Sequence, residues 1–543
     1  MPRLPDPSVS YWPADTSRPV LNLTAGDAVR QAALRHPDRC ALVEVVPEGL
    51  PSLTGADRKD RRWTYAELLA DSERCAHWLL GRFAPGDHVC VWAPNVPEWV
   101  ILQYGAALAG MVLVTANPAL RAEELRYVLK QSRSVALIHV DAFRGTDMAA
   151  VAGQVAGEVK EVFSLSRWGE VRGRNQTGEL PKVDLRAPAQ LQYTSGTTGQ
   201  PKGALLHHMG LLTNASYVTA RLELGHGVLI SPMPLFHTAG SVMSVLGSMV
   251  SGATLVLPQF FDTEAVLAAI EREKATVLYG VPTMLIALLE HPKRDLYDLA
   301  SLRFANSGGA PVPPELLRRV QAGLGCDLLS VYGQTEASPI ICQTAPHDAP
   351  DDKAETAGRP LWNVEVRIAD PVNGSAVPVG AGGEVQAKGY QTMLGYYDMP
   401  DATNQAFTKD GWLRTGDLGV MDDRGYVRIT GRLKDMIIRG GENIYPVEVE
   451  ARLLEHPEVV DAAVFGLPDS HWGEVVCAAL RFRNSENAPT ATELRDFCRQ
   501  TLAPQKAPSR YFASTAFPLT GSGKVQKFRL IQQAREGSIV PLQ

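Results

Sequence analysis

Short apolar runs alternate with helical stretches through the first two thirds of the sequence, and this alternation constrains the fold more than any other feature. The runs with the length and composition of buried strands are 87–92, 112–115, 135–140, 228–231, 254–257, 276–279 and 302–305. Strands separated by helices in this way are typical of a largely parallel sheet with helices packed on both faces. The sequence therefore predicts a doubly wound α/β structure built in layers.

Hydroxyl residues mark where helices begin. Thr24 precedes an amphipathic helix, and Thr64 with Glu67 three residues later forms a capping box at the start of another. A further helix is expected over 123–130. The charged run 58–62 is expected to be a solvated loop.

The pattern changes towards the C-terminus. From about residue 364, short strands separated by Gly and Asp turns indicate a small antiparallel subdomain. From about residue 434 we expect a final α+β domain, with a helix that begins at Pro446 and a strand over 459–465. The sequence contains no internal repeat or low-complexity tract.

Composition limits the class of protein. A chain of 543 residues, 45% apolar and 21% charged, has the balance of a globular enzyme larger than one ordinary domain. A net charge of −6 and a pI near 6.1 give no basic footprint for a nucleic-acid partner. The seven cysteines include no C-x-x-C pair, so we expect reduced thiols in a cytoplasmic protein.

One stretch has the composition of a membrane span, because residues 228–261 contain no Asp, Glu, Lys or Arg. Proline and glycine interrupt this stretch repeatedly, so we expect a strand, a loop, a buried helix and a second strand instead. The first seven residues lack the apolar core of a secretory signal. We therefore expect neither a membrane span nor secretion.

The stretch 193–203, Tyr-Thr-Ser-Gly-Thr-Thr-Gly-Gln-Pro-Lys-Gly, combines hydroxyl residues, glycines and a lysine. Such a loop can surround a polyphosphate with backbone N–H groups, hydroxyls and an ammonium group. It is not a Walker loop, because Lys202 follows a proline and no Ser or Thr follows the lysine. The flanks 191–193 and 204–206 have the pattern of strand edges, which would hold the flexible part between ordered segments.

This string resembles the phosphate-binding signature of the adenylate-forming superfamily, which includes acyl-CoA synthetases, peptide-synthetase adenylation domains and firefly luciferase. The resemblance extends over essentially the whole chain. It implies an α/β fold with a large multi-layer N-terminal adenylate-forming domain of αβαβα type, which carries the small antiparallel β subdomain, and a small mobile α+β C-terminal domain. The loop residues that would bind ATP are Thr194, Ser195, Gly196, Thr197, Thr198, Gly199, Gln200, Pro201 and Lys202.

A second stretch, 331–336, places an aromatic residue, a hydroxyl and a carboxylate on a turn after a strand. The resemblance implies that Thr335 contacts the α-phosphate, that Glu336 holds Mg²⁺ and that Tyr332 lies along the adenine. Gly333 and Gln334 belong to the same nucleotide-binding segment. A single carboxylate is chemically sufficient, because Mg²⁺ in nucleotide sites is usually bound by one or two carboxylates with phosphates and water.

Two further segments complete the nucleotide site that the resemblance implies. Gly308, Gly309 and Ala310 would form the adenine shelf and one wall of the acyl pocket. Asp417 would accept both ribose hydroxyls, which suits a carboxylate with two acceptor oxygens, and Arg432 would reach the ribose or phosphate.

The region 431–446 resembles the family's domain junction, with the hinge at Lys434. This implies an N-terminal domain of residues 1–433 and a C-terminal domain of residues 434–543 that rotates between two half-reactions. After the rotation, Arg439, Gly440 and Gly441 would line the pantetheine tunnel. Lys524 would enter the site for adenylation and neutralise charge as pyrophosphate leaves.

His237 lies where the family has an aromatic residue or a histidine beside the acyl group, so the resemblance implies a role in substrate gating. Small residues near the predicted acyl pocket, among them Gly280 and Ala337, leave room for a medium-chain or aromatic acid. The amino-acid sequences of the hinge and of the C-terminal lysine segment look most like those of bacterial medium-chain or aryl acyl-CoA synthetases.

The expected activity is that of an AMP-forming acid–thiol ligase. It would use ATP, Mg²⁺ and CoA to make an acyl-AMP and then an acyl-CoA, as a monomer or homodimer. Other acceptors or acids stay open: loading of a carrier protein, or activation of an inorganic acid such as nitrite for attack by an amine. A non-catalytic scaffold is disfavoured because Lys202, Glu336, Asp417 and Lys524 are all present. No protease, esterase, dehydrogenase or zinc motif occurs.

Overall fold

The structure is a computed structural model that describes residues 8–55, 60–173, 178–194, 200–309, 312–440, 442–484, 488–518 and 525–542. The chain divides into two compact units. The larger unit comprises Trp12–Val366 and Ala387–Leu413, and the smaller unit comprises Met1–Tyr11, Arg367–Gln386 and Arg414–Gln543. The domain boundary at residue 434 stays a prediction.

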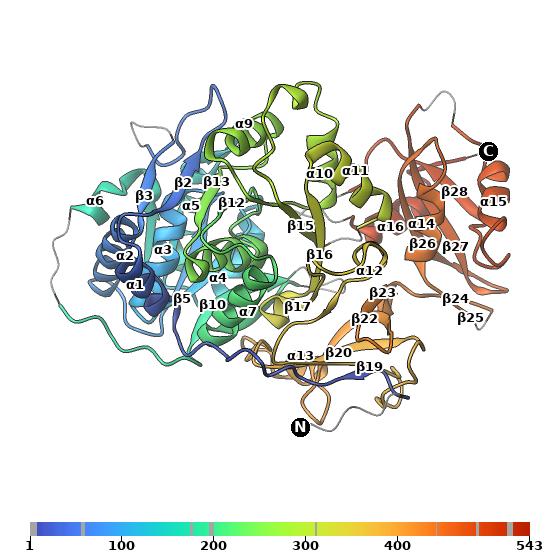
Figure 1. Cartoon of the computed structure of the whole chain (residues 1–543), viewed down its shortest axis with the longest axis horizontal. Coiled ribbons are helices and arrows are strands. Elements are labelled where there is room, and N and C mark those ends of the chain that lie inside the picture. The colour runs from blue at the N-terminus through green and yellow to red at the C-terminus, as the bar shows by residue number, and fades with distance from the viewer. Residues whose placement is uncertain are drawn as a thin grey trace. The chain divides into compact units, whose positions relative to one another are not determined.

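Two sheets form the centre of the larger unit (Figure 1). In the described residues, the first sheet has the strand order β21 (Gly395–Tyr396), β11 (Lys202–His207), β10 (Pro188–Thr194), β5 (Val112–Ala116), β4 (His88–Trp92), β6 (Ala136–His139) and β9 (Glu161–Ser164). Strands β10, β5, β4, β6 and β9 are parallel, whereas β11 and β21 are antiparallel to their neighbours.

The second sheet is also parallel at its centre and antiparallel at both edges. Its order is β18 (Arg359–Pro360), β17 (Ile340–Gln343), β16 (Asp327–Gly333), β15 (Phe304–Gly308), β14 (Val277–Tyr279), β12 (Val228–Ile230), β13 (Thr254–Pro258), β2 (Cys40–Val45) and β3 (Arg62–Thr64). The strands predicted from the apolar runs are therefore confirmed, with ends that differ by at most three residues. A small hairpin, β7 (Ala142–Phe143) and β8 (Thr146–Asp147), stands apart from both sheets.

Helices pack around these sheets. The α-helices of the larger unit are α1 (Ala25–Arg35), α2 (Tyr65–Leu80), α3 (Pro97–Leu108), α4 (Ala122–Gln131), α5 (Met148–Val155), α6 (Gly169–Arg172), α7 (His208–Arg221), α8 (Gly247–Ser251), α9 (Thr263–Glu273), α10 (Pro282–Leu289), α11 (Pro314–Leu324), α12 (Pro350–Glu355) and α13 (Pro400–Ala406). Thr24 and Thr64 both form capping boxes, as predicted for Thr64. Leu267, Ile270 and Val320, from α9 and α11, pack with Val43 and Leu278 of the second sheet in one hydrophobic core.

The uncharged stretch 228–261 folds as β12, a loop, a helical segment and β13. The expected buried helix begins as a π-helix, η3 (Ala239–Leu246), and continues as α8, a helix type that the sequence did not indicate. The Ser244 hydroxyl donates to the Ala239 carbonyl at 2.8 Å, five residues back, inside the wider turn. Within the described part of the chain, no helix has both the length and the apolar character needed to cross a bilayer.

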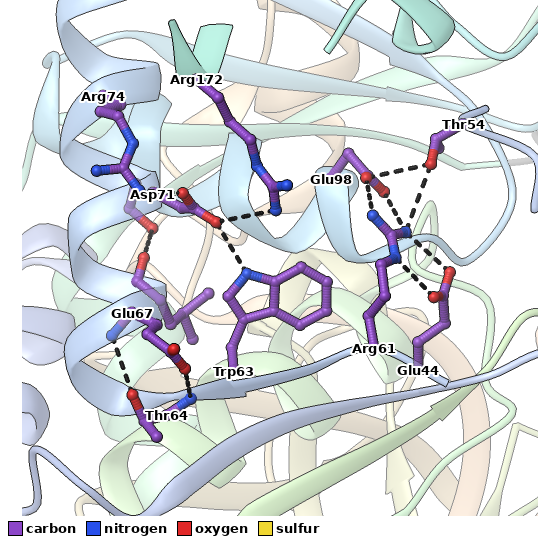
Figure 2. A network of polar contacts seen from close by, with 12 residues as sticks. Glu44, Thr54, Arg61, Trp63, Thr64, Glu67, Asp71, Arg74, Glu98 and Arg172 are labelled. Carbon is purple, nitrogen blue, oxygen red and sulfur yellow. Dashed lines mark hydrogen bonds and ion pairs between the residues drawn. The ribbon is translucent and has the colours of Figure 1, made fainter. Parts of the chain in front are cut away.

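The charged run 58–62 is only partly the solvated loop that was expected, among its described residues 60–62. Arg62 begins β3, and the Arg61 side chain is only 12% exposed. Arg61 pairs with Glu44 and Glu98 in a network that joins β2, β3 and α3 (Figure 2). The prediction was wrong here because the two acidic partners lie 17 and 37 residues away, where local charge patterning gives no signal.

The smaller unit contains two more sheets, some strands of which continue into the larger unit. One has the order β1 (Tyr11–Trp12), β19 (Val364–Ala369), β20 (Gly383–Gly389), β22 (Leu413–Met421) and β23 (Val427–Arg432). The other has β25 (Glu442–Ile444), β24 (Ile437–Arg439), β27 (Gly473–Phe482), β28 (Arg510–Ala513) and β29 (Val540–Pro541), with β26 (Val459–Asp469) also paired to β27.

Strand β27 shows why the last sheet is covered on both faces. Val476, Ala478 and Leu480 pack with α14 (Pro446–Leu454) and α15 (Ala491–Arg499), whereas the alternate residues pack with α16 (Lys527–Glu536). Successive side chains of a strand point to opposite faces, so an almost uniformly apolar strand needs a helix layer on each side. The fold class predicted from the sequence is confirmed.

Candidate active site

The glycine-rich loop connects two antiparallel strands, β10 and β11. Thr194, the last residue of β10, is paired with Lys202, the first residue of β11, so their side chains emerge on the same face of the sheet. Tyr127 of α4 donates a hydrogen bond to the Pro201 carbonyl at 2.8 Å, which fixes the chain just before Lys202. Ser195, Gly196, Thr197, Thr198 and Gly199 lie outside the described residues, and Gln200 is exposed beside them.

Lys202 and Glu336 are connected by Tyr396, a residue that sequence reasoning missed. The Lys202 ammonium lies 5.1 Å from the centroid of the Tyr396 ring, and the Tyr396 hydroxyl donates to Glu336 Oε1 at 2.6 Å. Tyr396 reaches this position because β21 pairs with β11, with Tyr396 opposite Ala204. Burial, and then the Glu336 charge, raise the pKa of the Tyr396 phenol, so it stays a neutral donor.

The turn that carries Glu336 has a tightly constrained backbone. Thr335 and Glu336 lie in a short 3₁₀ helix, η5 (Thr335–Ala337), directly after β16. The Gln334 N–H donates to the Pro339 carbonyl at 2.8 Å, which closes the turn. A Cβ on Gly333 would lie 1.9 Å from that carbonyl oxygen, so no other residue fits there. Tyr332 precedes Gly333 on β16 and is half-buried.

The predicted adenine shelf lies at the end of β15, beside β16. Gly308 is paired with Val331, and a Cβ at Gly308 would come within 2.5 Å of the Val331 carbonyl oxygen. Gly309 has a φ of +77°, which favours glycine. The shelf therefore begins at the carboxyl end of a parallel strand, where open α/β sheets bind ligands. Ala310 lies outside the described residues.

His237 lies in a tight turn just before the π-helix η3. Its Nδ1 accepts a hydrogen bond from the Ala239 N–H at 3.2 Å, and its carbonyl accepts the Gly240 N–H at 2.9 Å. A Cβ on Gly240 would lie 2.2 Å from the Pro234 carbonyl oxygen, so the turn requires glycine there. The imidazole is thus oriented by a backbone N–H of the same turn.

The predicted ribose-binding residues belong to the smaller unit. Arg432 Nε lies 3.0 Å from Asp417 Oδ1, and the two residues are paired across β22 and β23. Glu384, which sequence reasoning also missed, is buried and supports the turn before Asp417. It pairs with Arg414 at 3.0 Å and accepts the Gly416 N–H at 3.3 Å.

The predicted hinge and tunnel residues also lie in the smaller unit. Lys434 is in the 3₁₀ helix η6 (Leu433–Asp435). The Arg439 guanidinium lies 5.4 Å from the centroid of the Trp472 ring, and Gly440, with φ +59°, donates its N–H to the Trp472 carbonyl. Gly441 and Lys524 lie outside the described residues.

The structure therefore brings predicted site residues together in two groups. Thr194, Lys202 and Glu336 come together in the larger unit, and Asp417 and Arg432 come together in the smaller unit. The signal missing from the sequence was strand pairing, because Tyr396 and Glu384 acquire their roles from partners 60 and about 30 residues away.

Comparisons with known proteins identify the family of the chain. The family of AMP-binding enzymes matches residues 29–397, and the AMP-binding enzyme C-terminal domain matches residues 448–524. A putative acyl-CoA synthetase, YngI of Bacillus subtilis, is 38% identical over 95% of this chain and 98% of its own. Human medium-chain acyl-CoA ligase ACSF2, a mitochondrial protein, is 35% identical over 97% of this chain and 90% of its own.

The solved structures give the same result. The o-succinylbenzoate CoA synthetase MenE from Bacillus subtilis, solved with its acyl-adenylate intermediate, is 32% identical with a TM-score of 0.80, over 93% of this chain and 97% of that one. Sequence, domain composition and fold agree over nearly the full length. The chain belongs to the AMP-dependent acyl-CoA synthetase/ligase family of adenylate-forming enzymes.

Proposed function

We propose that this enzyme condenses a medium-chain or aryl carboxylic acid with ATP to an acyl-AMP, releasing pyrophosphate, and then transfers the acyl group to the thiol of CoA, releasing AMP. The observation that carries the proposal is the group Lys202, Tyr396 and Glu336 on one face of the sheet, next to the phosphate-binding loop. This group supplies a cation and an oriented carboxylate where anionic reactants must meet.

In the first half-reaction a carboxylate oxygen of the acid attacks the α-phosphorus, and the bond to the pyrophosphate oxygen breaks. The acid and the nucleotide are both anionic, so charge repulsion must be offset. Lys202 and the loop N–H groups would bind the phosphates, and Thr335 would donate its hydroxyl to the α-phosphate. Tyr396 would keep Lys202 and Glu336 in place, because its ring and its hydroxyl contact one of them each.

Glu336 has the chemistry to hold Mg²⁺ in this site. Its carboxylate is buried, and Oε1 accepts the Tyr396 hydroxyl, while a carboxylate carries a second oxygen that can bind a metal. One carboxylate with phosphate oxygens and water is a usual Mg²⁺ environment. When bound, the ion would neutralise the charge that develops on the phosphates.

In the second half-reaction the CoA sulfur attacks the acyl carbonyl carbon, the bond to the AMP oxygen breaks, and the thiol proton is lost. Asp417 would accept the ribose hydroxyls, with Arg432 orienting its carboxylate at 3.0 Å. His237 would border the acyl group. Rotation of the C-terminal domain about Lys434 would exchange Lys524 for Arg439, Gly440 and Gly441 between the two steps.

We infer a cytoplasmic location, which is supported by the cysteines: all seven are unpaired, and six of them are buried. Burial raises the pKa of these thiols, for example that of Cys342 to about 12, so they would be inert fillers.

The test measures AMP and pyrophosphate released from ATP and Mg²⁺ over a panel of aliphatic and aryl acids, each with and without CoA. We expect AMP release that requires both a carboxylic acid and CoA, with the acyl-CoA product identified by mass. Turnover that is indifferent to CoA would contradict the thioester step. Addition of amines, carrier protein or nitrite to the same assay would then identify the alternative acceptor or acid.

A further inference from the structure

A cluster of buried polar side chains lies against the face of the first sheet that carries Thr194 and Lys202, further along the strands. Its members, which we call the glutamine cluster, are Gln103, Thr115, Gln190, Gln192 and Ser241. All five residues are at least 94% buried. They come from α3, β5, β10 and η3, elements that are far apart in the sequence.

Ser241 connects three of these elements. The Gln192 amide donates to Ser241 Oγ at 3.2 Å, and the Gln103 amide donates to the Ser241 carbonyl at 3.0 Å. The Ser241 hydroxyl in turn donates to the His237 carbonyl at 3.2 Å. The cluster is therefore joined to the turn that we assign to the acyl group.

Strand register places the other two members beside Gln192. Thr115 is its direct partner on β5, and Gln190 lies two residues earlier on β10, so all three side chains share one face. Thr194 and Lys202 lie on this same face. With a rise of about 3.3 Å per residue, Gln192 and Gln190 lie roughly 7 and 13 Å below Thr194 along the strand.

Several polar atoms of the cluster have no hydrogen-bond partner among the described residues. These atoms are Gln103 Oε1, Thr115 Oγ1, Gln190 Oε1 and Gln190 Nε2. A buried polar atom without a partner destabilises the fold, so several in one place require an explanation. A bound molecule that supplies the missing partners would remove this cost.

The cluster also limits the charge of that molecule. Strands β5 and β10 and helix η3 carry no Asp, Glu, Lys or Arg, and Glu98 of α3 is paired with Arg61. Burying a charged group without an opposite charge is strongly unfavourable. The missing partner is therefore neutral and able to donate and accept hydrogen bonds.

We propose that the glutamine cluster determines substrate specificity by binding a neutral polar substituent, such as a hydroxyl, oxo or amide group, on the acyl part of the acid. The inference rests on the proposed function and makes the preferred substrate an oxygenated acid instead of a plain alkanoic or unsubstituted aryl acid. Gln190, with two unpartnered atoms, and Gln103, whose amide oxygen is unpartnered, are the main specificity determinants.

The experiment compares kcat/KM of pyrophosphate release for matched acids. Octanoate is compared with hydroxy- and oxo-octanoates substituted at each position, and benzoate is compared with the hydroxybenzoates. We expect at least one oxygenated isomer to exceed its unsubstituted parent by tenfold or more. Gln190→Met and Gln103→Met should each reduce this preference to near parity. Gln343→Met, at a buried glutamine on β17, should keep the wild-type preference.

Melting temperature separates specificity from folding. The Gln190→Met enzyme should melt at or above the wild-type temperature, because the substitution removes unpartnered buried atoms. Equal or lower kcat/KM for every oxygenated isomer would overturn the inference and assign the cluster to internal water. Absence of turnover with all acids would instead refute the proposed function.

Discussion

The Tyr396 side chain contacts both charged groups that the first half-reaction requires, Lys202 through its ring and Glu336 through its hydroxyl. A cation over an aromatic face and a phenol–carboxylate hydrogen bond both lose strength steeply with distance. Tyr396 thus defines the separation of the two charges. In the proposed mechanism it is a positioning residue, since it would act on substrate through Lys202 and Glu336.

Removal of the Tyr396 hydroxyl should slow adenylation. Tyr396→Phe keeps the ring over Lys202 but frees Glu336, and we expect kcat/KM for acid-dependent pyrophosphate exchange to fall about tenfold, the effect of one charge-assisted hydrogen bond. The Mg²⁺ concentration for half-maximal activity should rise as well. Tyr297→Phe removes a similar hydroxyl–carboxylate contact on the surface, to Glu264, and should change neither quantity. Unaltered Mg²⁺ dependence in Tyr396→Phe would contradict the positioning role.

Gly333 and Gly153 should respond to the same substitution in opposite ways. Gly333→Ala places a Cβ 1.9 Å from the Pro339 carbonyl oxygen, so we expect a loss of about 1–3 kcal/mol in unfolding free energy and at least tenfold slower adenylation. Gly153 lies inside helix α5, where an added Cβ would meet nothing within 4 Å, so Gly153→Ala should gain about 0.5–1 kcal/mol. Urea unfolding measures the free energy of unfolding of both variants. An unchanged free energy of unfolding in Gly333→Ala would show that the turn is not tight.

Individual site residues could be predicted where one short segment carries the whole signal. Lys202 and Glu336 belong to such segments, and the structure places them on either side of Tyr396. Tyr396 and Glu384 could not be predicted in this way, because a Tyr in a short strand and a Glu in a β-hairpin have no local signature. Their roles depend on which strands pair, and that is decided by packing over the whole domain.

At the scale of elements, the network around Arg61 joins β2, β3 and α3 (Figure 2). Arg61 contacts Glu44 at 2.8 and 2.9 Å and Glu98 at 2.5 and 3.1 Å, and Thr54 also donates to Glu98. Burial opposes the charge on Arg61, but the hydrogen bonds that its guanidinium donates to both carboxylates outweigh this effect and raise its pKa. Two carboxylates therefore depend on one cation.

Loss of that cation should be costly. Arg61→Met leaves Glu44 and Glu98 buried without a partner charge, and we expect the free energy of unfolding to fall by about 3–5 kcal/mol. Adding Glu44→Gln and Glu98→Gln to the Arg61→Met chain should restore most of the lost free energy of unfolding. Arg318→Met breaks an exposed pair with Glu315 and should cost less than about 1 kcal/mol. Equal effects of Arg61→Met and Arg318→Met in denaturant titrations would contradict a structural role for the network.

Helices and strands could be predicted where the hydrophobic periodicity and the capping residues indicate the same element. The Thr64 capping box and the buried strands from β4 to β15 are found where the sequence places them. The π-helix η3 was not, because 239–246 contains no charged residue and only two hydroxyl residues, Ser241 and Ser244, too few to define a periodicity that distinguishes helix types. Its wider turn depends on tertiary partners such as Gln103 and Tyr104 of α3, which donate to the Ser241 and Val245 carbonyls.

At the scale of the whole molecule, buried histidines should make stability depend on pH. Burial lowers the pKa values of His88, His139, His207 and His208, in the last case to about 4. Below pH 6.5 the unfolded chain then binds more protons than the folded one, so the free energy of unfolding falls as pH drops from 6.5 towards 4.

His208 should contribute on the order of 3 kcal/mol to this loss. In His208→Asn, the amide oxygen can still accept the Ala25 N–H that the imidazole accepts at 3.3 Å, so the fold is retained without a titrating group. We expect a flatter plot of unfolding free energy against pH between 6.5 and 4. His347→Asn, at an exposed histidine, should reproduce the wild-type slope. If the plot for His208→Asn has the same slope as that of the wild type, the loss of stability at low pH does not come from His208.

The proposed rotation of the C-terminal domain between the two half-reactions can be tested at Lys524. If the C-terminal domain brings Lys524 to the phosphates only for adenylation, Lys524→Ala should slow pyrophosphate exchange by about 10²–10³-fold, the usual loss for one group that stabilises transition-state charge. Transfer from chemically prepared acyl-AMP to CoA should stay within about twofold of wild type, because that step follows the rotation about Lys434. Lys527→Ala is the matched control, since Lys527 is already paired with Glu450 at 2.7 Å and should affect neither step. Equal losses in both half-reactions would mean that Lys524 stays near the nucleotide throughout, and the proposed exchange of C-terminal residues between the two steps would then be wrong.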